Sequence, residues 1–380
     1  MGSRRHRIVL TGMALAAPAG MLRSRAAAIL CVMTLCITSV HGQSRVNELN
    51  DAGWKALRDG YQDRAASLFA EALTVRPNDP VLLMGAGAAA HAQGKQKEAM
   101  TSLQKALDVM PGLTPASILL GQIAFDEGDV DLAIRTYEDA LTHAPRNPDL
   151  TRTLDQWRRE ASVHKSFDEW RYERFRVLFE GHAEQSLARQ ATDVFNSEFF
   201  RIANKLGEYP PDTIVAVLYT EQQFRDVTRA PAWAGGQYDG RIRIPVAGAS
   251  QQPELFEKVL THELAHAIVA GIAPSGVPAW LNEGLAQYFD GTDVSTAARR
   301  MRALGRSIPL KRLEGSFGRL NAAEAQVAYD ESLLAVNVIA ERSAFGWTRL
   351  LHQLADGQSF DDVMGSYGFS YADLEAPFAR

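Results

Sequence analysis

Hydrophobic residues in the second half of the chain recur at helical spacing between Pro253 and Gly271. Proline suits the first position of a helix and glycine the position after its last turn, so these two residues mark the expected ends of the helix. The periodic positions predict an amphipathic helix with one face on a core; they are Leu255, Val259, Leu260, Leu264, Ala267 and Ile268.

Other segments predict a small sheet that precedes a set of helices. Residues 175–179 alternate like a strand, and residues 214–219 form a short apolar strand. Between these two strands, residues 183–206 carry apolar side chains on one side of a long helix. Helical patterns dominate from Ala297 onward. The C-terminal part, residues 171–380, is therefore predicted to have an α+β fold.

One further strand is predicted at residues 241–244, where Arg and Ile alternate. This alternation is typical of a half-buried strand. Pro245 near its end favours a position at the edge of the sheet, because proline cannot donate a ladder hydrogen bond.

The first half of the chain has a period of 34 residues in its small, bulky and proline positions. Such a period resembles tetratricopeptide repeats, in which small residues let paired helices approach and proline ends the second helix. Residues 43–148 are therefore predicted to form an all-α array of three repeats, and residues 149–170 a capping or linker helix. The positions in phase are Gly53, Gly87 and Gly121; Gly60, Gly94 and Gly128; Phe69, Leu103 and Tyr137; and Pro77, Pro111 and Pro145.

A repeat array of this kind usually presents a concave surface to a protein or peptide partner. The sequence contains no anchor residues that separate this interpretation from a structural appendage of the second domain.

Residues 262–266 read His-Glu-Leu-Ala-His within the predicted helix. His262 and His266 are four residues apart and project from one helix face, so that two neutral imidazoles can bind one zinc ion. Glu263 can reach a water on that metal without being a ligand. A catalytic zinc site needs a third protein ligand, for which Glu283 in Trp-Leu-Asn-Glu-Gly is the candidate.

The spacing of these residues resembles that of gluzincin metallopeptidases, and the smaller peptidase-MA-like proteins are the nearest likeness. The resemblance implies one Zn²⁺ on His262, His266 and Glu283, with Glu263 as general base. Two departures from the pattern are visible. Many gluzincins orient a ligand histidine with an Asp four residues after the ligand Glu, where this chain has Gln287. The chain also lacks the Gly-x-Met-Glu-Asn segment of zinc aminopeptidases, which disfavours aminopeptidase activity.

Two further roles are implied by the resemblance. Tyr329 lies where related enzymes carry a tyrosine that stabilises the oxyanion; the alternative is a tyrosine packed against the core. The strand at 241–244 matches the edge strand with which substrate peptides pair, or it is an ordinary edge strand protected by charge.

Residues 1–42 are predicted to be a signal peptide, with arginines around an apolar stretch at residues 26–40 that is short for a membrane span. An uncleaved leader would instead anchor the protein to a membrane. Both cysteines, Cys31 and Cys36, lie in this segment. The prediction is therefore export to the periplasm or the extracellular space.

The charge composition disfavours one class of partner, nucleic acid. The formal net charge is −5, and no long basic run follows the leader, so nucleic acid is not an expected partner. Together these observations predict a zinc-dependent peptidase that cuts a peptide or protein substrate and carries a repeat domain for a protein partner. The alternative is an inactive repeat scaffold with a vestigial peptidase fold.

Overall fold

The computed structural model describes residues 44–181, 184–210, 213–230, 234–341 and 346–376. The predicted signal peptide lies outside these residues, so export and membrane anchoring stay predictions. Among the described residues, no helix combines the length and the apolar character needed to cross a bilayer.

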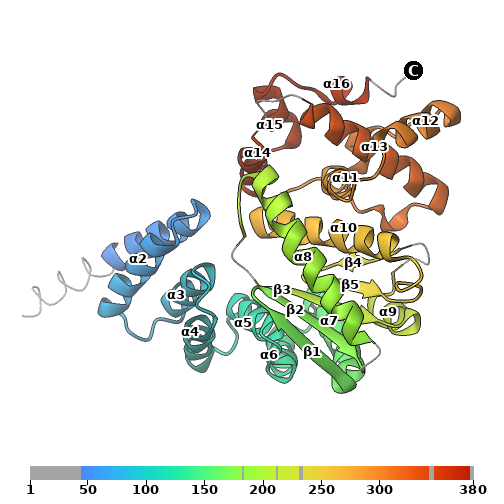
Figure 1. The fold of residues 1–380 in the computed structure, drawn as a ribbon. Coiled ribbons are helices and arrows are strands. Elements are labelled where there is room, and N and C mark those ends of the chain that lie inside the picture. Colours follow the sequence, from blue (N-terminus) through green and yellow to red (C-terminus); the bar gives the residue numbers. More distant parts are fainter. Residues whose placement is uncertain (1–43, 182–183, 211–212, 231–233, 342–345, 377–380) are drawn as a thin grey trace, which may run out of the picture.

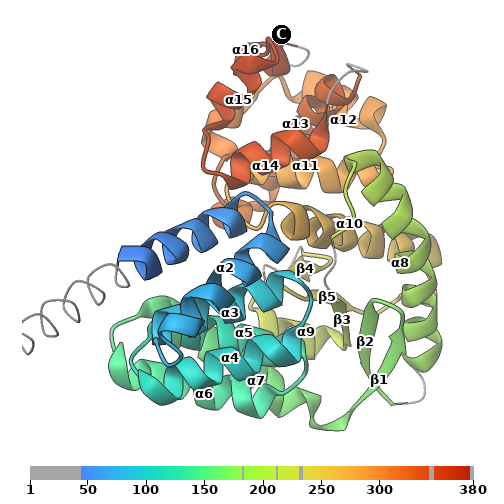
Figure 2. The same ribbon diagram turned by 90° about the vertical axis from the view of Figure 1, so that its left-hand side faces the viewer.

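The N-terminal part is a stack of antiparallel helix pairs (Figures 1 and 2). The first pair is a helix over residues 44–58 with α2 (Gln62–Val75). The second is α3 (Pro80–Ala92) with α4 (Gln96–Val109), and the third is α5 (Thr114–Asp126) with α6 (Val130–His143). An added helix, α7 (Pro148–Val163), covers the end of the stack.

The 34-residue period has a direct packing explanation. A Cβ added at Gly53 would lie 2.7 Å from the ring of Phe69, one at Gly87 2.7 Å from Leu103, and one at Gly121 2.4 Å from Tyr137. Each helix pair therefore closes around one bulky side chain that only glycine can accommodate, and this contact recurs in every repeat.

The second part contains a five-stranded mixed sheet in the order β1-β2-β3-β5-β4. Strands β2 (Phe175–Glu180), β3 (Ile214–Tyr219) and β5 (Ile242–Pro245) are parallel, and β1 (Phe167–Tyr172) and β4 (Gln237–Tyr238) are antiparallel additions at the two edges. Helices α8 (Gln185–Leu206) and α10 (Pro253–Ile272) pack on one face, and α9 (Glu221–Thr228) on the other.

Helices dominate the rest of the chain and cover α10 on the side away from the sheet (Figure 1). The two that matter most for the site are α11 (Ala279–Phe289) and α13 (Ala322–Ala340), which pack against each other and, through α11, against α10. The remaining helices are α12 (Val294–Leu304), α14 (Trp347–Ala355), α15 (Phe360–Ser366) and α16 (Tyr371–Glu375).

Two predicted element boundaries differ from the structure in this region. The linker helix ends at Val163, and β1 begins at Phe167 inside the segment expected to be helical. Helix α10 starts at Pro253 as predicted but continues past Gly271 to Ile272. Gly271 is required there for packing, because a Cβ would lie 2.6 Å from Pro210.

The prediction of a half-buried edge strand at 241–244 is wrong. Strand β5 lies inside the sheet between β3 and β4, and its residues Ile242 to Ile244 are buried. The alternation has another cause. Ile242 and Ile244 face the core under α10, while Arg241 and Arg243 form ion pairs with Glu160 of α7.

Glu160 is the centre of a buried charge network that joins the repeat array to the sheet. Its carboxylate lies 2.9 Å from both Arg241 and Arg243, and all three side chains are at most 3% exposed. Arg241 also stacks over the ring of Phe125 and donates to its carbonyl. Burial alone would raise the pKa of Glu160, but the two guanidinium groups outweigh burial and lower it. The repeats and the sheet are therefore held together by charges that compensate each other away from water.

We expect Glu160→Ala to lower the free energy of unfolding by about 3–5 kcal/mol, because it leaves the buried Arg241 without its carboxylate partner and Arg243 with Asp239 alone. Urea unfolding followed by circular dichroism measures the loss. The matched control is Glu138→Ala, which removes the exposed ion pair with Arg158 and should cost less than about 1 kcal/mol. Equal losses in the two variants would contradict a special role for the buried network.

Candidate metal centre and active site

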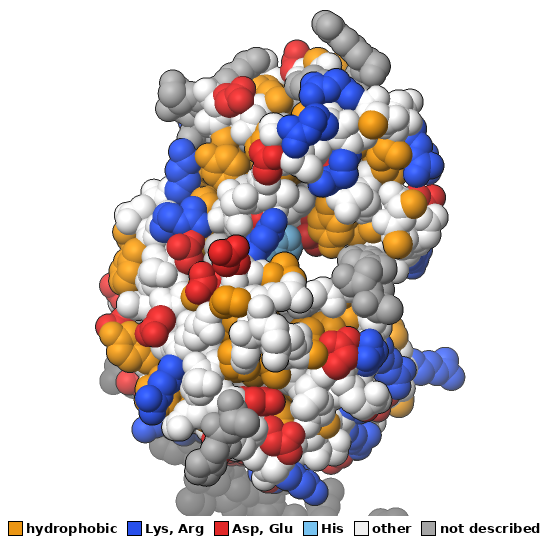
Figure 3. All heavy atoms as spheres, turned by 45° about the vertical axis from the view of Figure 1, so that its right-hand side comes forward, with side chains coloured by type: hydrophobic (Ala, Val, Ile, Leu, Met, Phe, Trp, Pro, Cys, Tyr) orange, Lys and Arg blue, Asp and Glu red, His pale blue; other side chains and the backbone are white. Residues whose placement is uncertain are grey.

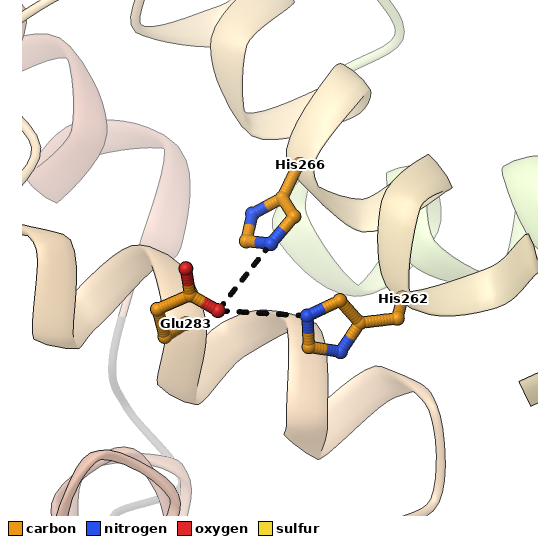
Figure 4. Close-up of side chains that lie close together, drawn as sticks. All are labelled: His262, His266 and Glu283. Carbon is orange, nitrogen blue, oxygen red and sulfur yellow. Dashed lines mark ion pairs between the residues drawn. The ribbon is translucent and has the colours of Figure 1, made fainter. Parts of the chain in front are cut away.

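Helix α10 presents the histidine pair to α11. His262 and His266 lie one helical turn apart, with ring centroids separated by 4.9 Å and ring planes nearly perpendicular. Figure 4 shows both rings pointing at one carboxylate oxygen of Glu283, which comes from the facing helix. The Nε2 atoms of both histidines lie 3.5 Å from Glu283 Oε2.

The three side chains thus form a cluster suited to a metal ion. Their nearest ligand atoms all lie within 4.8 Å of one another. The sequence predicted this convergence from the motif and the 16-residue spacer, and the structure brings all three residues together as expected.

Glycine at position 284 sets the position of the ligand carboxylate. A Cβ at Gly284 would lie 2.4 Å from the carbonyl oxygen of Ser332 on α13, so any larger residue would push the two helices apart. The close approach of α11 to α13 fixes the helix turn that carries Glu283. This explains in physical terms why glycine follows the candidate ligand.

His262 is oriented by Asp290, a residue that the sequence did not reveal. The Nδ1 atom of His262 lies 2.9 Å from Asp290 Oδ2, and the side chain of Asp290 is 4% exposed. Thr292 donates to the other oxygen of Asp290 from its backbone N–H, at 2.8 Å, and from its hydroxyl. A carboxylate behind a metal-binding histidine fixes the ring orientation and tautomer.

Gln287 occupies the position at which the family pattern places this acid, but its side chain does not contact His262 in the described contacts and binds α13 instead. Its side-chain N–H donates to the carbonyl of Tyr329 at 2.8 Å, which ties α11 to α13. Asp290 lies seven residues after Glu283, close to two helical turns, and therefore faces the same side of α11 as position 287. A search for acidic residues one turn further along the helix could have found it.

Glu263 lies beside the cluster under a glycine segment. A Cβ at Gly236 would lie 2.6 Å from Glu263 Oε1 and 2.9 Å from its carboxyl carbon. The chain before β4 therefore passes so close to this carboxylate that a side chain at position 236 would displace it. Glu263 is 5% exposed, and its Oε2 has no hydrogen-bond partner among the described residues.

The electrostatics of the cluster favour a bound cation. Burial raises the pKa of Glu263, with a further contribution from the charge of Glu283. Burial would lower the pKa of His262, but its contacts with Asp290, Glu283 and Glu263 outweigh burial and raise the pKa to about 10. A metal ion takes the place of the proton on such a histidine and releases it to solvent.

Tyr329 of α13 borders the same space. With His262, Glu263, Lys258 and Gly236, it lines a cavity of about 230 Å³. Burial, together with the charges of Glu283 and Glu263, raises the pKa of its hydroxyl, so the phenol keeps its proton. Its ring also packs edge-on against Phe317 at 5.5 Å. Both interpretations of this residue therefore have a structural basis.

A polar extension continues the cavity toward α12. It has a volume of about 490 Å³ and shares Lys258, His262, Asp290 and Tyr329 with the first cavity. Figure 3 shows this opening as a hollow with histidine atoms at its base and a basic side chain beside them. The candidate centre is therefore accessible to a substrate from outside.

Comparison with known families agrees with the fold. Residues 196–379 match the family model of the Peptidase MA superfamily, which covers α10, α11 and α13. This part of the chain is therefore a Peptidase MA superfamily domain. Residues 114–147, the third helix pair, match a tetratricopeptide repeat model, so the N-terminal part carries repeats of that class.

Solved structures similar to this chain include two tetratricopeptide repeat domains. One is the first tetratricopeptide repeat domain of Spaghetti (RPAP3) bound to an HSP90 peptide, 22% identical, covering 31% of this chain and 97% of that chain, with a TM-score of 0.30. Another is the Sgt2 repeat domain from Aspergillus fumigatus, 25% identical, covering 31% of this chain and 79% of that chain, also with a TM-score of 0.30.

Glu331 on α13 is another carboxyl group with a raised pKa, but it does not line either cavity of the site. Its side chain is 0% exposed, and its Oε1 accepts a hydrogen bond of 2.7 Å from the backbone of Ile308. Burial raises its pKa to about 8, with smaller contributions from Glu375 and Asp330. The group therefore affects stability rather than chemistry at the site.

This shift predicts a pH-dependent stability. Between about pH 4.5 and 8 the folded protein keeps the Glu331 proton that the unfolded chain loses, so the contribution of this group to stability falls as pH rises through that window. Glu331→Gln should remove this loss, and its midpoint of urea unfolding relative to the wild type should rise from pH 5 to pH 8. The exposed Glu341→Gln is the control. A difference from the wild type that stays constant with pH would contradict the assignment.

Proposed function

We propose that this chain is a zinc-dependent peptidase. The observation that carries the proposal is the convergence of His262, His266 and Glu283, with Glu263 beside them in an accessible cavity. Membership of residues 196–379 in the Peptidase MA superfamily supports the same reaction class. The reaction is hydrolysis of a peptide bond in a peptide or protein substrate.

The residues present fit a zinc ion. Ligand atoms about 2.0–2.2 Å from a tetrahedral zinc lie roughly 3.3–3.5 Å apart. The separation of 3.5 Å from each histidine Nε2 to Glu283 Oε2 is close to this value. Two imidazoles and one carboxylate are also the ligand set that leaves a position open for catalysis. His262 has the supporting carboxylate that such a ligand requires.

Each side chain then has a role in hydrolysis. When bound, zinc supplies a Lewis acid that acidifies water and polarises a carbonyl group. Glu263, which lies beside the three candidate ligands with one carboxylate oxygen unpartnered among the described residues, takes the proton of the attacking water and passes it to the leaving amine. The Tyr329 hydroxyl, which keeps its proton, is a candidate donor to the developing oxyanion.

A missing acid at position 287, where many gluzincins carry Asp, would favour the inactive-scaffold alternative. Asp290 occupies the orienting position behind His262, so that departure from the family pattern no longer indicates decay. The alternative would still be supported by a purified protein that binds zinc and cuts no peptide.

The repeat domain is proposed to bind a protein or peptide, as arrays of this kind commonly do. Export directed by residues 1–42 is proposed on the sequence of that segment alone.

The first test separates metal binding from catalysis. Glu263→Gln keeps the three proposed ligands and removes the base, so we expect about one zinc per chain and loss of peptide cleavage. Glu283→Ala is the companion variant and should lose most of the zinc. Metal analysis and digestion of a mixed peptide library measure the two properties. Full cleavage by Glu263→Gln would refute the mechanism, and full zinc content in Glu283→Ala would refute the proposed ligand.

The second test concerns Asp290. Asp290→Ala should weaken zinc binding by about 10–100-fold, because His262 loses the group that orients its ring. Competition with a chelating dye measures the affinity without any need for activity. Gln287→Ala is the matched control on the same helix face and should leave zinc affinity within about threefold of the wild type. A larger effect at position 287 than at position 290 would show that the orienting group has been misassigned.

A further inference from the structure

The repeat array and the peptidase-like domain enclose a cleft of about 580 Å³. One wall comes from the turn between α3 and α4 and from the end of α5. The other comes from the start of β3 and from the turn between β4 and β5. Residues that line it include Lys95, Lys97, Glu98, Glu127, Thr213 and Tyr238.

A smaller cavity of about 120 Å³ lies between this cleft and α10, the helix that carries His262 and His266. It shares Thr213, Tyr238 and Gly240 with the cleft, and its remaining lining includes Ala267 and Gly271 of α10. Ala267 directly follows the candidate ligand His266 in the sequence. The cleft is therefore connected to the same helix that carries the metal centre.

Strand β4 runs between the two sites. Gly236, just before the strand, lies against Glu263, while Tyr238 and Gly240 at its other end line the cleft. Within the described sheet β4 is the outer strand, paired only with β5. The outward main-chain groups of such a strand can pair with an added extended chain.

The position of the repeat wall is fixed by bonds close to the turn after β4. Gln156 of α7 donates to Asp239 at 2.6 Å, and Arg176 of β2 donates to the carbonyl of Asp126 on α5 at 2.7 Å. With the network around Glu160, these bonds hold the repeats opposite the strand.

The charges that line the cleft are of both signs, which favours a ligand recognised through its main chain and not through its net charge. Lys95 and Lys97 contribute positive charge, and Glu98, Asp126 and Glu127 contribute negative charge. A wall of mixed sign does not select an acidic or a basic peptide. An extended polypeptide of mixed composition suits both this wall and the open strand edge.

We propose that the cleft binds the part of an extended polypeptide substrate that continues from the catalytic site along β4. The inference rests on the proposed peptidase function and adds that the repeat array is a substrate-binding wall of the enzyme. Gly236 lies against Glu263 and Tyr238 lines the cleft, so the short strand β4 (Gln237–Tyr238) runs from one site to the other, and paired strands advance at the same rate. An arm of more than about five residues on one side of the scissile bond therefore reaches the cleft.

The test uses the full chain and internally quenched peptides built on a sequence that the enzyme cuts in a mixed library. One peptide is short, and two others carry a long arm on either the N-terminal or the C-terminal side. We expect one arm, and not the other, to raise kcat/KM about tenfold or more, a gain equivalent to about 1.4 kcal/mol of binding. Equal kcat/KM for all three peptides would overturn the proposal.

Thr213→Trp should abolish the gain, because the exposed Thr213 lines both the cleft and the smaller cavity. Cleavage of the short peptide should stay within about twofold, which shows that the variant is folded and that its metal centre is intact. Thr142→Trp on the exposed side of α6 is the matched control and should retain the gain. Lys97→Trp, on the repeat wall, is a second blocking variant. An undiminished gain in both blocking variants would also overturn the proposal.

A binding measurement separates this inference from the proposed function. Fluorescently labelled, reduced and alkylated α-lactalbumin serves as the extended chain, with anisotropy as the signal. Wild type should bind it, and Thr213→Trp should bind it about tenfold more weakly than Thr142→Trp does. If no peptide is cut but this difference appears, the peptidase function fails while the cleft remains a polypeptide site. If cleavage occurs and the difference is absent, the cleft assignment fails alone.

Discussion

The contact between α11 and α13 at Gly284 is the constraint on which the site depends. Helices whose backbones approach this closely cannot slide or rotate without a clash, because the carbonyl of Ser332 occupies the space of a Cβ. Glu283 is the preceding residue, so its direction is determined by the packing of two helices rather than by its own contacts. The histidine pair needs only α10, but the third side chain requires the whole helical layer. The metal centre is therefore a product of tertiary packing.

Much of the site could be predicted from the sequence, since its key residues lie on regular helices with recognisable spacing. The pair at 262 and 266 depends on helix periodicity alone, and Glu283 follows in a second short helix. The repeats were predictable for a similar reason. Gly53, Gly87 and Gly121 each contact one bulky side chain of the paired helix, so the same local packing contact recurs three times at a spacing of 34 residues. Contacts within one helix or one helix pair therefore produce a periodic pattern that can be recognised in the sequence.

The features that the sequence did not reveal depend on contacts between distant segments. Asp290 supports His262 from the C-cap of α11, one turn beyond the position at which the family pattern places an acid. The alternation of Arg and Ile in β5 predicts water on one face, whereas the polar face meets Glu160, 81 residues earlier than Arg241. Charge burial between two domains produces the same pattern as solvent exposure. In one case the polar face contacts water and in the other it pairs with a distant acid, and the sequence of the strand alone is the same for both.

The Glu160 network also determines where the chain can be divided. By sequence, α7 continues the helical array, yet its buried acid Glu160 pairs with two arginines that belong to the sheet. A fragment that starts at residue 148 keeps this acid, whereas a fragment that starts at β1 loses both the acid and the helix that covers the two arginines, and so exposes this face of the sheet to water. The autonomous C-terminal unit therefore includes the last helix of the solenoid, and limited proteolysis or truncation would have to respect that boundary.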